Sequence, residues 1–309
     1  MFTGFTGLRS PFSGFSGFYG KITVVSSAIE VRGLVKSYRA GKNVVSAVKG
    51  IDLDVKTGEI FALLGPNGAG KTSTIEILEG YRSRDGGTLT VLGEDPATTN
   101  LPAWRNRVGI VLQSTKDGAD LSVEEILTHF ARYYSNPRSV DEVIAAVGLE
   151  EKRKARGEHL SGGQRRRLDV ALGIIGNPEL LFLDEPTTGF DPEARRSFWE
   201  LIRTLRSEGT TILMSTHYLD EAEALADRVA VMNHGVIVDC ATPERLGGRD
   251  REQVIIRWRE GGSLHQELTA SPTEFIRQLT SRIPGEIPEL SVARPTLEEI
   301  YLQMIGGQE

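Results

Sequence analysis

The sequence predicts an α/β fold in which helices cover a mostly parallel β-sheet. Segments with strand and helix patterns alternate between residues 160 and 245. Apolar runs such as residues 180–183 have the length of buried strands, and the segments between them carry apolar residues at helical intervals. The character of the chain changes near residues 247–250, so we predict a main domain at residues 28–248 and a small C-terminal α+β domain at residues 249–309.

The N-terminal segment, residues 1–27, repeats Gly, Phe, Ser and Thr. Glycine and serine interrupt its apolar residues at nearly every step, whereas a signal peptide has a continuous apolar stretch. We predict a disordered extension or translation from an upstream start codon. Contact of its six aromatic side chains with a membrane surface is the alternative.

The main domain opens with alternating polar and apolar residues, which predict the strands of an antiparallel β subdomain. Strands are predicted at residues 29–38, 48–55, 59–65, 87–93, 180–185 and 210–216, with a hairpin-like pair at 229–239. Helices are predicted at residues 72–80, 160–175, 192–209 and 219–229.

A helical subdomain is predicted at about residues 114–165, because residues 121–158 carry apolar side chains at three- and four-residue intervals. Within it, Ser139 is the expected N-cap of a helix, and Glu142 would complete a capping box.

The C-terminal domain is predicted to contain a strand at residues 252–260 and helices at 272–282 and 295–305. Thr296 and Glu299 have the spacing of a capping box at the start of the last helix.

Composition limits the classes of function. The 309 residues carry a net charge of −6, so the protein has no overall field for binding nucleic acid, and no such partner is expected. The single cysteine, Cys240, rules out an internal disulfide and a thiolate metal site, which fits a reducing cytoplasm. No apolar run approaches the roughly 18–20 residues that cross a bilayer, so a membrane role would depend on a partner.

A glycine-rich turn separates the strand at residues 59–65 from the helix at 72–80 and fits the P-loop pattern G-x-x-x-x-G-K-[ST] without departure. The P-loop residues are Gly65, Pro66, Asn67, Gly68, Ala69, Gly70, Lys71 and Thr72. Its N–H groups and the helix N-terminus suit phosphate oxygens. Lys71 is placed to reach the β- and γ-phosphates, Thr72 to bind Mg²⁺, and Ser73 to complete the nucleotide contacts.

Two acids, Asp184 and Glu185, follow the apolar run at residues 180–183. The end of this strand is expected to carry both carboxylates to the P-loop. Because neighbouring strand residues point to opposite faces, we expect the two acids to have different roles. Asp184 is predicted to hold Mg²⁺ through water, and Glu185 to act as general base on the attacking water.

The segment at residues 160–164, Leu-Ser-Gly-Gly-Gln, opens a basic helix shortly before Asp184. It resembles the signature of the ATP-binding cassette (ABC) ATPases, and the resemblance covers about residues 28–245. In that family the signature of one subunit faces the P-loop of a second subunit across a shared ATP. The resemblance therefore implies ATP and Mg²⁺ as ligands, a two-fold homodimer, and ATP contacts from the signature. Those contacts would come from Ser161, Gly162, Gly163 and Gln164.

A serine hydroxyl, glycine N–H groups and a helix N-terminus together form a second anion cradle. Ser161 is also a simple helix N-cap, and the two interpretations are compatible.

The resemblance also implies roles for isolated residues. Tyr38 corresponds to the aromatic that stacks on adenine, although alone it would be an ordinary strand aromatic. Gln113 corresponds to the glutamine that contacts Mg²⁺ and senses the membrane partner. His217 corresponds to the histidine that contacts the γ-phosphate, so Lys71, Glu185 and His217 are the predicted catalytic residues. Asp191 corresponds to the aspartate of the loop that crosses between subunits, with Phe190 where leucine is common.

The partners implied by the resemblance are integral membrane permease subunits, whose coupling helices would dock between residues 113 and 160. The basic run at residues 152–156, followed by 165–167, is either a solvated face or a contact with acidic partner residues or lipid head groups. The run at residues 293–302 is similar to the tail of exporter ATPases of the daunorubicin-resistance type. Its helix could pack on its own domain or on the sister subunit.

The tail resemblance implies an ATPase at the cytoplasmic face of the cell membrane that powers export of a drug, antibiotic, lipid or polysaccharide. A soluble ABC ATPase of DNA repair, chromosome organisation or translation is the main alternative. The chain has no long coiled coil and no cysteine-rich zinc module, and it has a single P-loop and a single signature, which disfavours that alternative. A regulatory module without turnover is disfavoured by Glu185 and His217.

Overall fold

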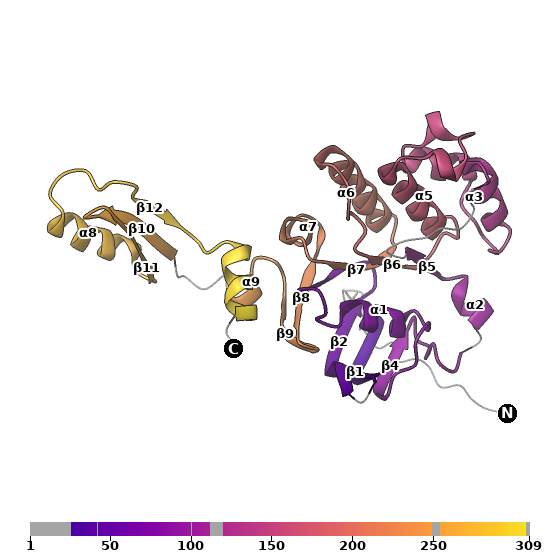
Figure 1. Ribbon diagram of the computed structural model, residues 1–309, viewed down its shortest axis with the longest axis horizontal. Coiled ribbons are helices and arrows are strands. Elements are labelled where there is room, and N and C mark those ends of the chain that lie inside the picture. The colour runs from indigo at the N-terminus through magenta and orange to yellow at the C-terminus, as the bar shows by residue number, and fades with distance from the viewer. Residues whose placement is uncertain (1–25, 42, 100, 112–119, 249–253, 307–309) are drawn as a thin grey trace, which may run out of the picture.

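The computed structural model describes residues 26–41, 43–99, 101–111, 120–248 and 254–306. Gln113 and nearly all of the predicted N-terminal extension lie outside the described residues. Figure 1 shows a main body of sheets and helices, from which the C-terminal sheet and helix α8 extend to one side.

The central sheet has six strands in the order β5-β6-β7-β3-β8-β9. These are β3 (Ile60–Leu64), β5 (Val108–Val111), β6 (Leu180–Asp184), β7 (Thr211–Thr216), β8 (Arg228–Asn233) and β9 (Val236–Ala241). Neighbouring strands from β5 to β8 are parallel, and β9 is antiparallel to β8. Every residue of β3, β6 and β7 is buried, as expected where both faces of a parallel sheet are covered. The predicted mostly parallel sheet is confirmed.

A second sheet is antiparallel and has the order β2-β1-β4. Its strands are β1 (Ser27–Ala40), β2 (Asn43–Lys56) and β4 (Gly86–Val91). Their apolar residues share one core cluster with helix α1 (Lys71–Leu78) and the inner face of the central sheet. The predicted α/β fold with an antiparallel β part is therefore confirmed.

The remaining helices of the main body are α2 (Leu101–Arg105), α3 (Val123–Ala131), α4 (Val140–Ala146), α5 (Gly162–Ile174), α6 (Pro192–Ser207) and α7 (Leu219–Leu225). Of these, α3, α5, α6 and α7 lie above the central sheet in Figure 1, whereas α2 lies beside β5 and packs its Trp104 into the cluster that contains α1. The helical prediction for residues 121–158 is only partly right, because short 3-10 turns at Glu150–Lys152 and Gly157–His159 follow α3 and α4. Helix α7 ends at Leu225 rather than at 229, since Arg228 already pairs with β3 at the start of β8. Within the described residues, no helix has the length and apolarity to span a bilayer.

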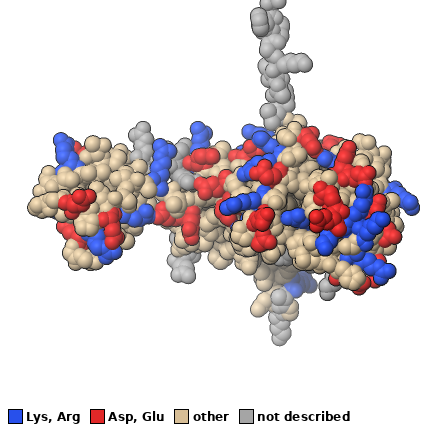
Figure 2. All heavy atoms as spheres, turned by 90° about the horizontal axis from the view of Figure 1, so that it is seen from above, with Lys and Arg blue, Asp and Glu red and all other residues tan. Residues whose placement is uncertain are grey.

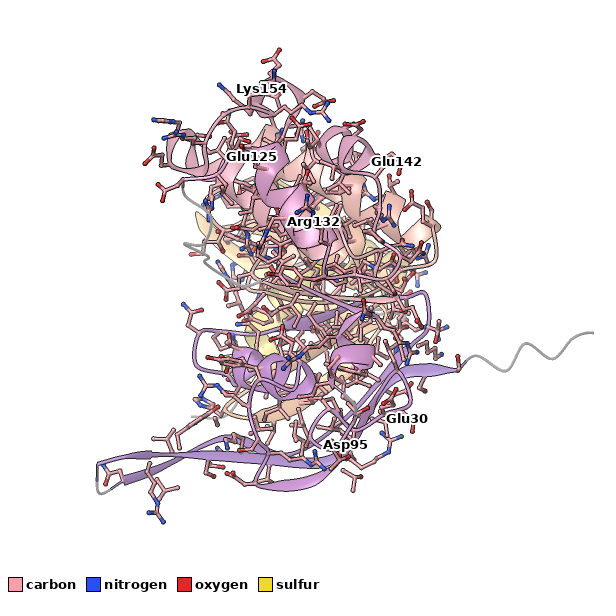
Figure 3. All side chains as sticks on the ribbon, turned by 90° about the vertical axis from the view of Figure 1, so that its right-hand side faces the viewer. Glu30, Asp95, Glu125, Arg132, Glu142 and Lys154 are labelled. Atoms are coloured by element: carbon pink, nitrogen blue, oxygen red, sulfur yellow. The ribbon has the colours of Figure 1, made fainter. Side chains whose placement is uncertain are left out.

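Ser139 is the N-cap residue of α4, as predicted, but the predicted capping box with Glu142 does not form. The Ser139 side chain makes no cap hydrogen bond, and Glu142 points toward solvent (Figure 3). At such an exposed helix start, water can satisfy the first N–H groups. A capping box that the sequence analysis did not predict forms instead at Ser122 and Glu125, at the start of α3.

The C-terminal sheet is antiparallel, in the order β11-β10-β12. It consists of β10 (Val254–Glu260), β11 (Ser263–Thr269) and β12 (Ser291–Ala293), with α8 (Pro272–Arg282) against it. A separate small core lies between sheet and helix and contains Ile256, Trp258, Leu279 and Ile287. Strands β11 and β12 were not predicted, because nearly all their residues are exposed and carry no apolar alternation.

The last helix, α9 (Leu297–Gly306), packs on the main body of its own chain. Leu297 and Tyr301 belong to the large core cluster, and the Asn233 amide donates a hydrogen bond to the Ile305 carbonyl at 3.4 Å. The predicted capping box forms, because the Glu299 N–H donates to the Thr296 hydroxyl and the Thr296 N–H donates to the Glu299 carboxylate. The sequence allows this helix to pack on its own domain or on the sister subunit, and in the structure it packs on its own chain.

Leu297→Ala should lower the free energy of unfolding by about 2–4 kcal/mol, because Leu297 is 2% exposed and its truncation leaves a cavity. Leu302→Ala is the matched control, since Leu302 lies on the same helix but is 54% exposed. Urea unfolding of the main body checks both variants. Equal effects of the two substitutions would show that α9 does not pack on the main body in solution.

Candidate functional site

The candidate site lies where the carboxyl ends of β3, β6 and β7 meet. In the parallel ladder Leu64 is opposite Thr216, and Asp184 is opposite Ser215. The P-loop follows β3, Glu185 follows β6, and His217 follows β7. Three segments far apart in the sequence therefore end side by side, at the edge of an α/β sheet where ligands usually bind.

The P-loop turns tightly from β3 into α1. Its glycines at 68 and 70 have φ values of 80° and 106°, a region that favours glycine. A Cβ atom on Gly70 would lie 2.3 Å from the Ala47 carbonyl oxygen, and one on Gly65 would lie 2.2 Å from that of Met232. Gly70 is the N-cap of α1 and has no side chain to occupy the helix N-terminus. The loop therefore presents backbone N–H groups as an anion cradle.

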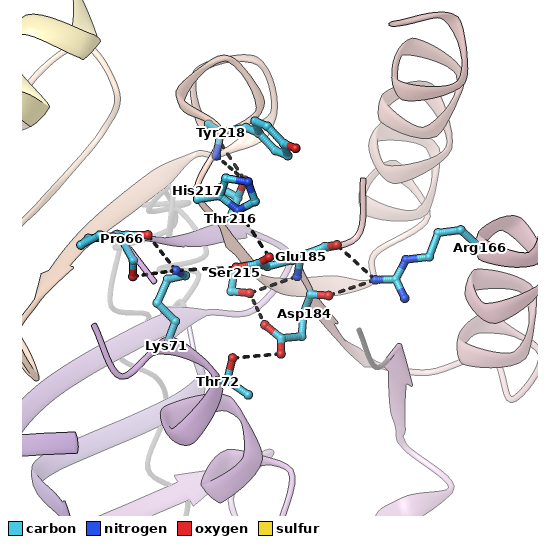
Figure 4. Close-up of polar contacts among 11 residues, drawn as sticks. Pro66, Lys71, Thr72, Arg166, Asp184, Glu185, Ser215, Thr216, His217 and Tyr218 are labelled. Atoms are coloured by element: carbon cyan, nitrogen blue, oxygen red, sulfur yellow. Dashed lines mark hydrogen bonds and ion pairs between the residues drawn. The ribbon is translucent and has the colours of Figure 1, made fainter. Parts of the chain in front are cut away.

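Lys71 is 4% exposed and lies inside this cradle. Its Nζ donates to the carbonyl oxygens of Gly65 at 2.7 Å and Pro66 at 3.2 Å, and lies 3.8 Å from Oε1 of Glu185 (Figure 4). Burial lowers the pKa of Lys71, and the carboxylates of Glu185 and Asp184 oppose that effect. A buried ammonium held only by carbonyls and one distant carboxylate suits a phosphate ligand.

Asp184 is buried at the end of β6 and accepts two hydroxyl hydrogen bonds. Thr72 Oγ1 donates to its Oδ2 at 3.1 Å, and Ser215 Oγ donates to its Oδ1. The P-loop hydroxyl and the strand-end carboxylate thus come together as predicted from the sequence. Hydroxyl and carboxylate oxygens are the kind of ligands that Mg²⁺ prefers.

Glu185 has a left-handed backbone, with φ of 46°. Its N–H is held by Ser215, whose carbonyl oxygen and Oγ accept at 3.2 and 3.1 Å. Its carboxylate lies between Lys71 and His217, and Oε2 is 3.4 Å from Nδ1 of the histidine (Figure 4). The two acids do point to different partners, but strand alternation is the wrong reason. Strand β6 ends at Asp184, and the left-handed turn aims Glu185.

His217 contacts the acid that follows β6, and Tyr38 contacts the residue that follows the P-loop. The His217 ring packs against Tyr218, with ring centroids 4.1 Å apart. The Tyr38 hydroxyl donates to Ser73 Oγ at 3.1 Å, and the Arg82 guanidinium carbon lies 5.5 Å from the centroid of the Tyr38 ring. Tyr38 is thus both a strand aromatic and a neighbour of the P-loop helix.

The signature segment, residues 160–164, lies at the N-terminus of α5. Ser161 accepts from the Gln164 N–H at 3.3 Å, and the Gln164 side chain accepts from the Ser161 N–H at 3.1 Å. The predicted N-cap is therefore formed. Ser161 and Gly162 are exposed, and a Cβ on Gly162 or Gly163 would meet nothing within 4 Å. This helix end is open to a ligand.

Asp191 serves as the N-cap of α6, where it accepts from the Ala194 N–H at 2.8 Å. Its neighbour Phe190 is buried against Phe198. The structure places Asp191 on an exposed loop end, directly before α6.

Comparison with known proteins decides the family. A model of the ABC transporter family matches residues 48–188. The chain is 38% identical to the daunorubicin/doxorubicin resistance ATP-binding protein DrrA of Streptomyces peucetius, over 92% of this chain and 94% of that protein. It is 42% identical to the Nod factor export ATP-binding protein I of Cupriavidus pinatubonensis, over 93% of each. The chain belongs to the ABC transporter family.

Solved structures agree on the fold of this ABC protein. An ATP-binding subunit of an ABC transporter matches 90% of the chain with a TM-score of 0.66 and 22% identity. A dimeric ATP-binding cassette with ADP and phosphate matches 69% of the chain, with a TM-score of 0.64 and 21% identity. The protein is the ATP-binding and ATP-hydrolysing subunit of an ABC transporter, and the soluble alternative is not supported.

Three buried polar residues of the ABC site were missed by the sequence analysis. Ser215 contacts both acids, but only the pairing of β6 with β7 places it there. Arg166 reaches the same segment from α5. Glu79 is buried at the C-cap of α1, where the sequence shows only an acid after an apolar helix. Arg166 belongs to the basic run at residues 165–167, and the solvated face or partner contact expected there is wrong for this residue, which is 6% exposed. Ser215 and Glu79 stand in no sequence motif.

Glu79 makes the stability of this ABC protein depend on pH. Burial, and to a lesser extent the carboxylates of Asp184 and Glu76, raise the pKa of Glu79 from its ordinary value of 4.5 to about 8. The folded protein therefore keeps a proton that the unfolded chain loses above pH 4.5. The contribution of Glu79 to the free energy of unfolding is therefore fully present below pH 4.5 and is lost as the pH rises toward 8.

Glu79→Gln should therefore raise the melting temperature at pH 8–9 and change it little near pH 4.5, because the amide cannot ionise. Thermal unfolding of both proteins from pH 4.5 to 9 in metal-free buffer checks this. A difference that stays constant with pH would contradict a raised pKa at Glu79.

Proposed function

We propose that two copies of this chain bind two Mg-ATP molecules between them and use their hydrolysis to drive a separate membrane permease. The observation that carries the proposal is the convergence of Lys71, Asp184, Glu185 and His217 at one sheet edge, while the signature helix end is exposed. A chain that presents half of a site and, elsewhere, an open anion cradle is suited to complete the site of a second copy.

Mg²⁺ is proposed to bind at Thr72 and Asp184, whose oxygens are 3.1 Å apart, with Gln113 as the further predicted contact. When bound, the ion would neutralise charge on the β- and γ-phosphates. Lys71 would turn from the carbonyls of Gly65 and Pro66 to donate to the phosphates.

Glu185 is the proposed general base, which accepts a proton from the water that attacks the γ-phosphate. Its carboxylate is 3.8 Å from Lys71 and 3.4 Å from His217, so two nitrogen groups hold it near the phosphate cradle. His217 would donate to the γ-phosphate, and Tyr38 would stack on adenine in place of Arg82.

The proposed permease contact is an open hollow of about 670 Å³ on the helical part of the chain. Figure 3 shows Glu125, Arg132 and Lys154 around this region. It is lined by Leu121, Ser122, Glu124, Glu125, Thr128, His129, Arg132, Lys154 and Arg156. Because both acidic and basic side chains line the hollow, it suits a partner helix that carries charges of both signs.

Nucleic acid is not proposed as a partner. On the face shown in Figure 2, basic and acidic side chains are interspersed rather than gathered into a basic stripe. Such a surface lacks the electrostatic footprint of nucleic-acid binding.

The proposed cargo is a drug, antibiotic, lipid or polysaccharide that the permease moves outward. The names of two relatives support export, since one is a drug-resistance protein and the other a Nod factor export protein. The subunit would then lie at the cytoplasmic face of the cell membrane, held there by the permease.

The proposal is tested by purifying the tagged chain from detergent-solubilised membranes of its source cells. We expect a stoichiometric integral membrane protein in the complex, and faster ATP hydrolysis when the complex is reconstituted with its cargo. Recovery of a fully active chain from the soluble fraction, without membrane protein, would contradict the proposed coupling.

A further inference from the structure

Arg166 is a buried arginine that joins the signature helix α5 to the segment carrying the two acids. It is 6% exposed. Its Nε donates to the Pro186 carbonyl at 2.9 Å, and its Nη2 donates to those of Asp184 at 2.9 Å and Glu185 at 3.3 Å (Figure 4). One guanidinium therefore binds three successive carbonyl groups.

These carbonyls belong to a turn whose left-handed backbone is unfavourable for a residue other than glycine. Glu185 is a non-glycine residue with φ of 46°, and such residues persist only where their surroundings over-determine them. Ser215 holds the N–H side of Glu185, with acceptors at 3.2 and 3.1 Å. Arg166 holds the carbonyl side. The left-handed turn is thus clamped from two elements, β7 and α5.

The charge of Arg166 is accommodated by nearby carboxylates. Its Nη1 lies 3.9 Å from Oδ2 of Asp169, one turn along the same helix. Burial lowers the pKa of Arg166, and Asp169, Asp184 and Glu221 oppose that effect. A planar guanidinium with donors in a fixed fork can reach three carbonyls at once, whereas the compact lysine ammonium cannot span them in the same way.

We propose that Arg166 is a positioning residue that keeps the Glu185 carboxylate aimed at the attacking water. The inference rests on the proposed role of Glu185 as general base. Because α5 begins at the signature segment, movement of that helix end would pass through Arg166 to the backbone of Glu185. The signature and the base of one chain are then mechanically linked.

The experiment compares Arg166→Met and Arg166→Lys with the wild-type full chain. We expect kcat for ATP hydrolysis to fall by about 10- to 100-fold in the Met variant, since a small misplacement of a catalytic group has effects of this size. The Kd for Mg-ATP should stay within about threefold, because Arg166 binds the backbone carbonyl of Asp184, whereas Thr72 and Ser215 hold its carboxylate. The Lys variant should lie between wild type and Met.

Arg203→Met is the matched control. Arg203 also donates to a backbone carbonyl, that of Ala224 at 3.1 Å, but on the exposed side of α6. Its kcat should equal that of wild type. Combining Arg166→Met with Glu185→Gln should cause no loss beyond that of Glu185→Gln, because Arg166 acts through Glu185.

Wild-type kcat in folded Arg166→Met, or a further loss in the double variant, would overturn the inference. If the Met variant does not fold, the Lys variant decides by the same kcat and Kd criteria. Undiminished turnover in Glu185→Gln alone would instead overturn the proposed base, so the two failures are distinguishable.

Discussion

Glu185→Gln is expected to lower kcat for ATP hydrolysis by about 10²–10⁴-fold while Mg-ATP binding is retained. The amide has the shape of the carboxylate but cannot accept the proton of the attacking water, and general-base catalysis contributes about 10²–10⁴-fold. The phosphate cradle and Asp184 are untouched, so binding remains. Because hydrolysis is what would release the dimer, the variant should accumulate as a nucleotide-locked dimer.

Steady-state hydrolysis, equilibrium binding of Mg-ATP and gel filtration measure the three expectations for Glu185→Gln. Glu208→Gln is a suitable control, since Glu208 is the C-cap of α6 and its carboxylate pairs with Arg138, which is not a site residue. Turnover at the wild-type rate in Glu185→Gln, with the control unaffected, would assign the base to another residue.

Lys71→Ala is expected to weaken Mg-ATP binding by about 30- to 150-fold. The estimate follows from about 2–3 kcal/mol for a hydrogen bond between a charged donor and a phosphate. Lys71 is buried within the P-loop, where it contacts the carbonyls of Gly65 and Pro66. A neutral, short side chain leaves the loop without its cation.

Equilibrium binding of Mg-ATP to Lys71→Ala, beside the exposed β2 variant Lys56→Ala, checks this expectation. The Lys56 variant should bind as wild type does, because its side chain is exposed and outside the P-loop. Equal affinity in all three proteins would count against the phosphate cradle.

The sequence was most informative where a chemical role needs a contiguous motif. The P-loop, residues 65–72, has a spacing that backbone geometry itself requires, and the structure forms the strand, turn and helix expected around it. The same holds for the apolar strand that ends at Asp184 and for the N-capped helix after Ser161. Their assigned roles in ATP hydrolysis stay predictions until the variants above are measured.

Sequence reasoning was weaker where local spacing is ambiguous or long-range pairing decides the outcome. Ser139 and Glu142 have the spacing of a capping box but form none, whereas Ser122 and Glu125 have the same spacing and form one. The spacing alone does not distinguish the two helix starts. The exposed strand β11 has no apolar alternation and forms through its backbone pairing with β10.

Local spacing and apolar periodicity predict the motifs, their order and the mostly parallel sheet. The orientation of Glu185 depends instead on contacts between distant parts of the chain. Its left-handed turn depends on Ser215 from β7 and Arg166 from α5, which are 30 and 19 residues away in the chain. The physical reason is that strand register and helix packing bring these groups together, and neither leaves a mark on the local sequence around Glu185.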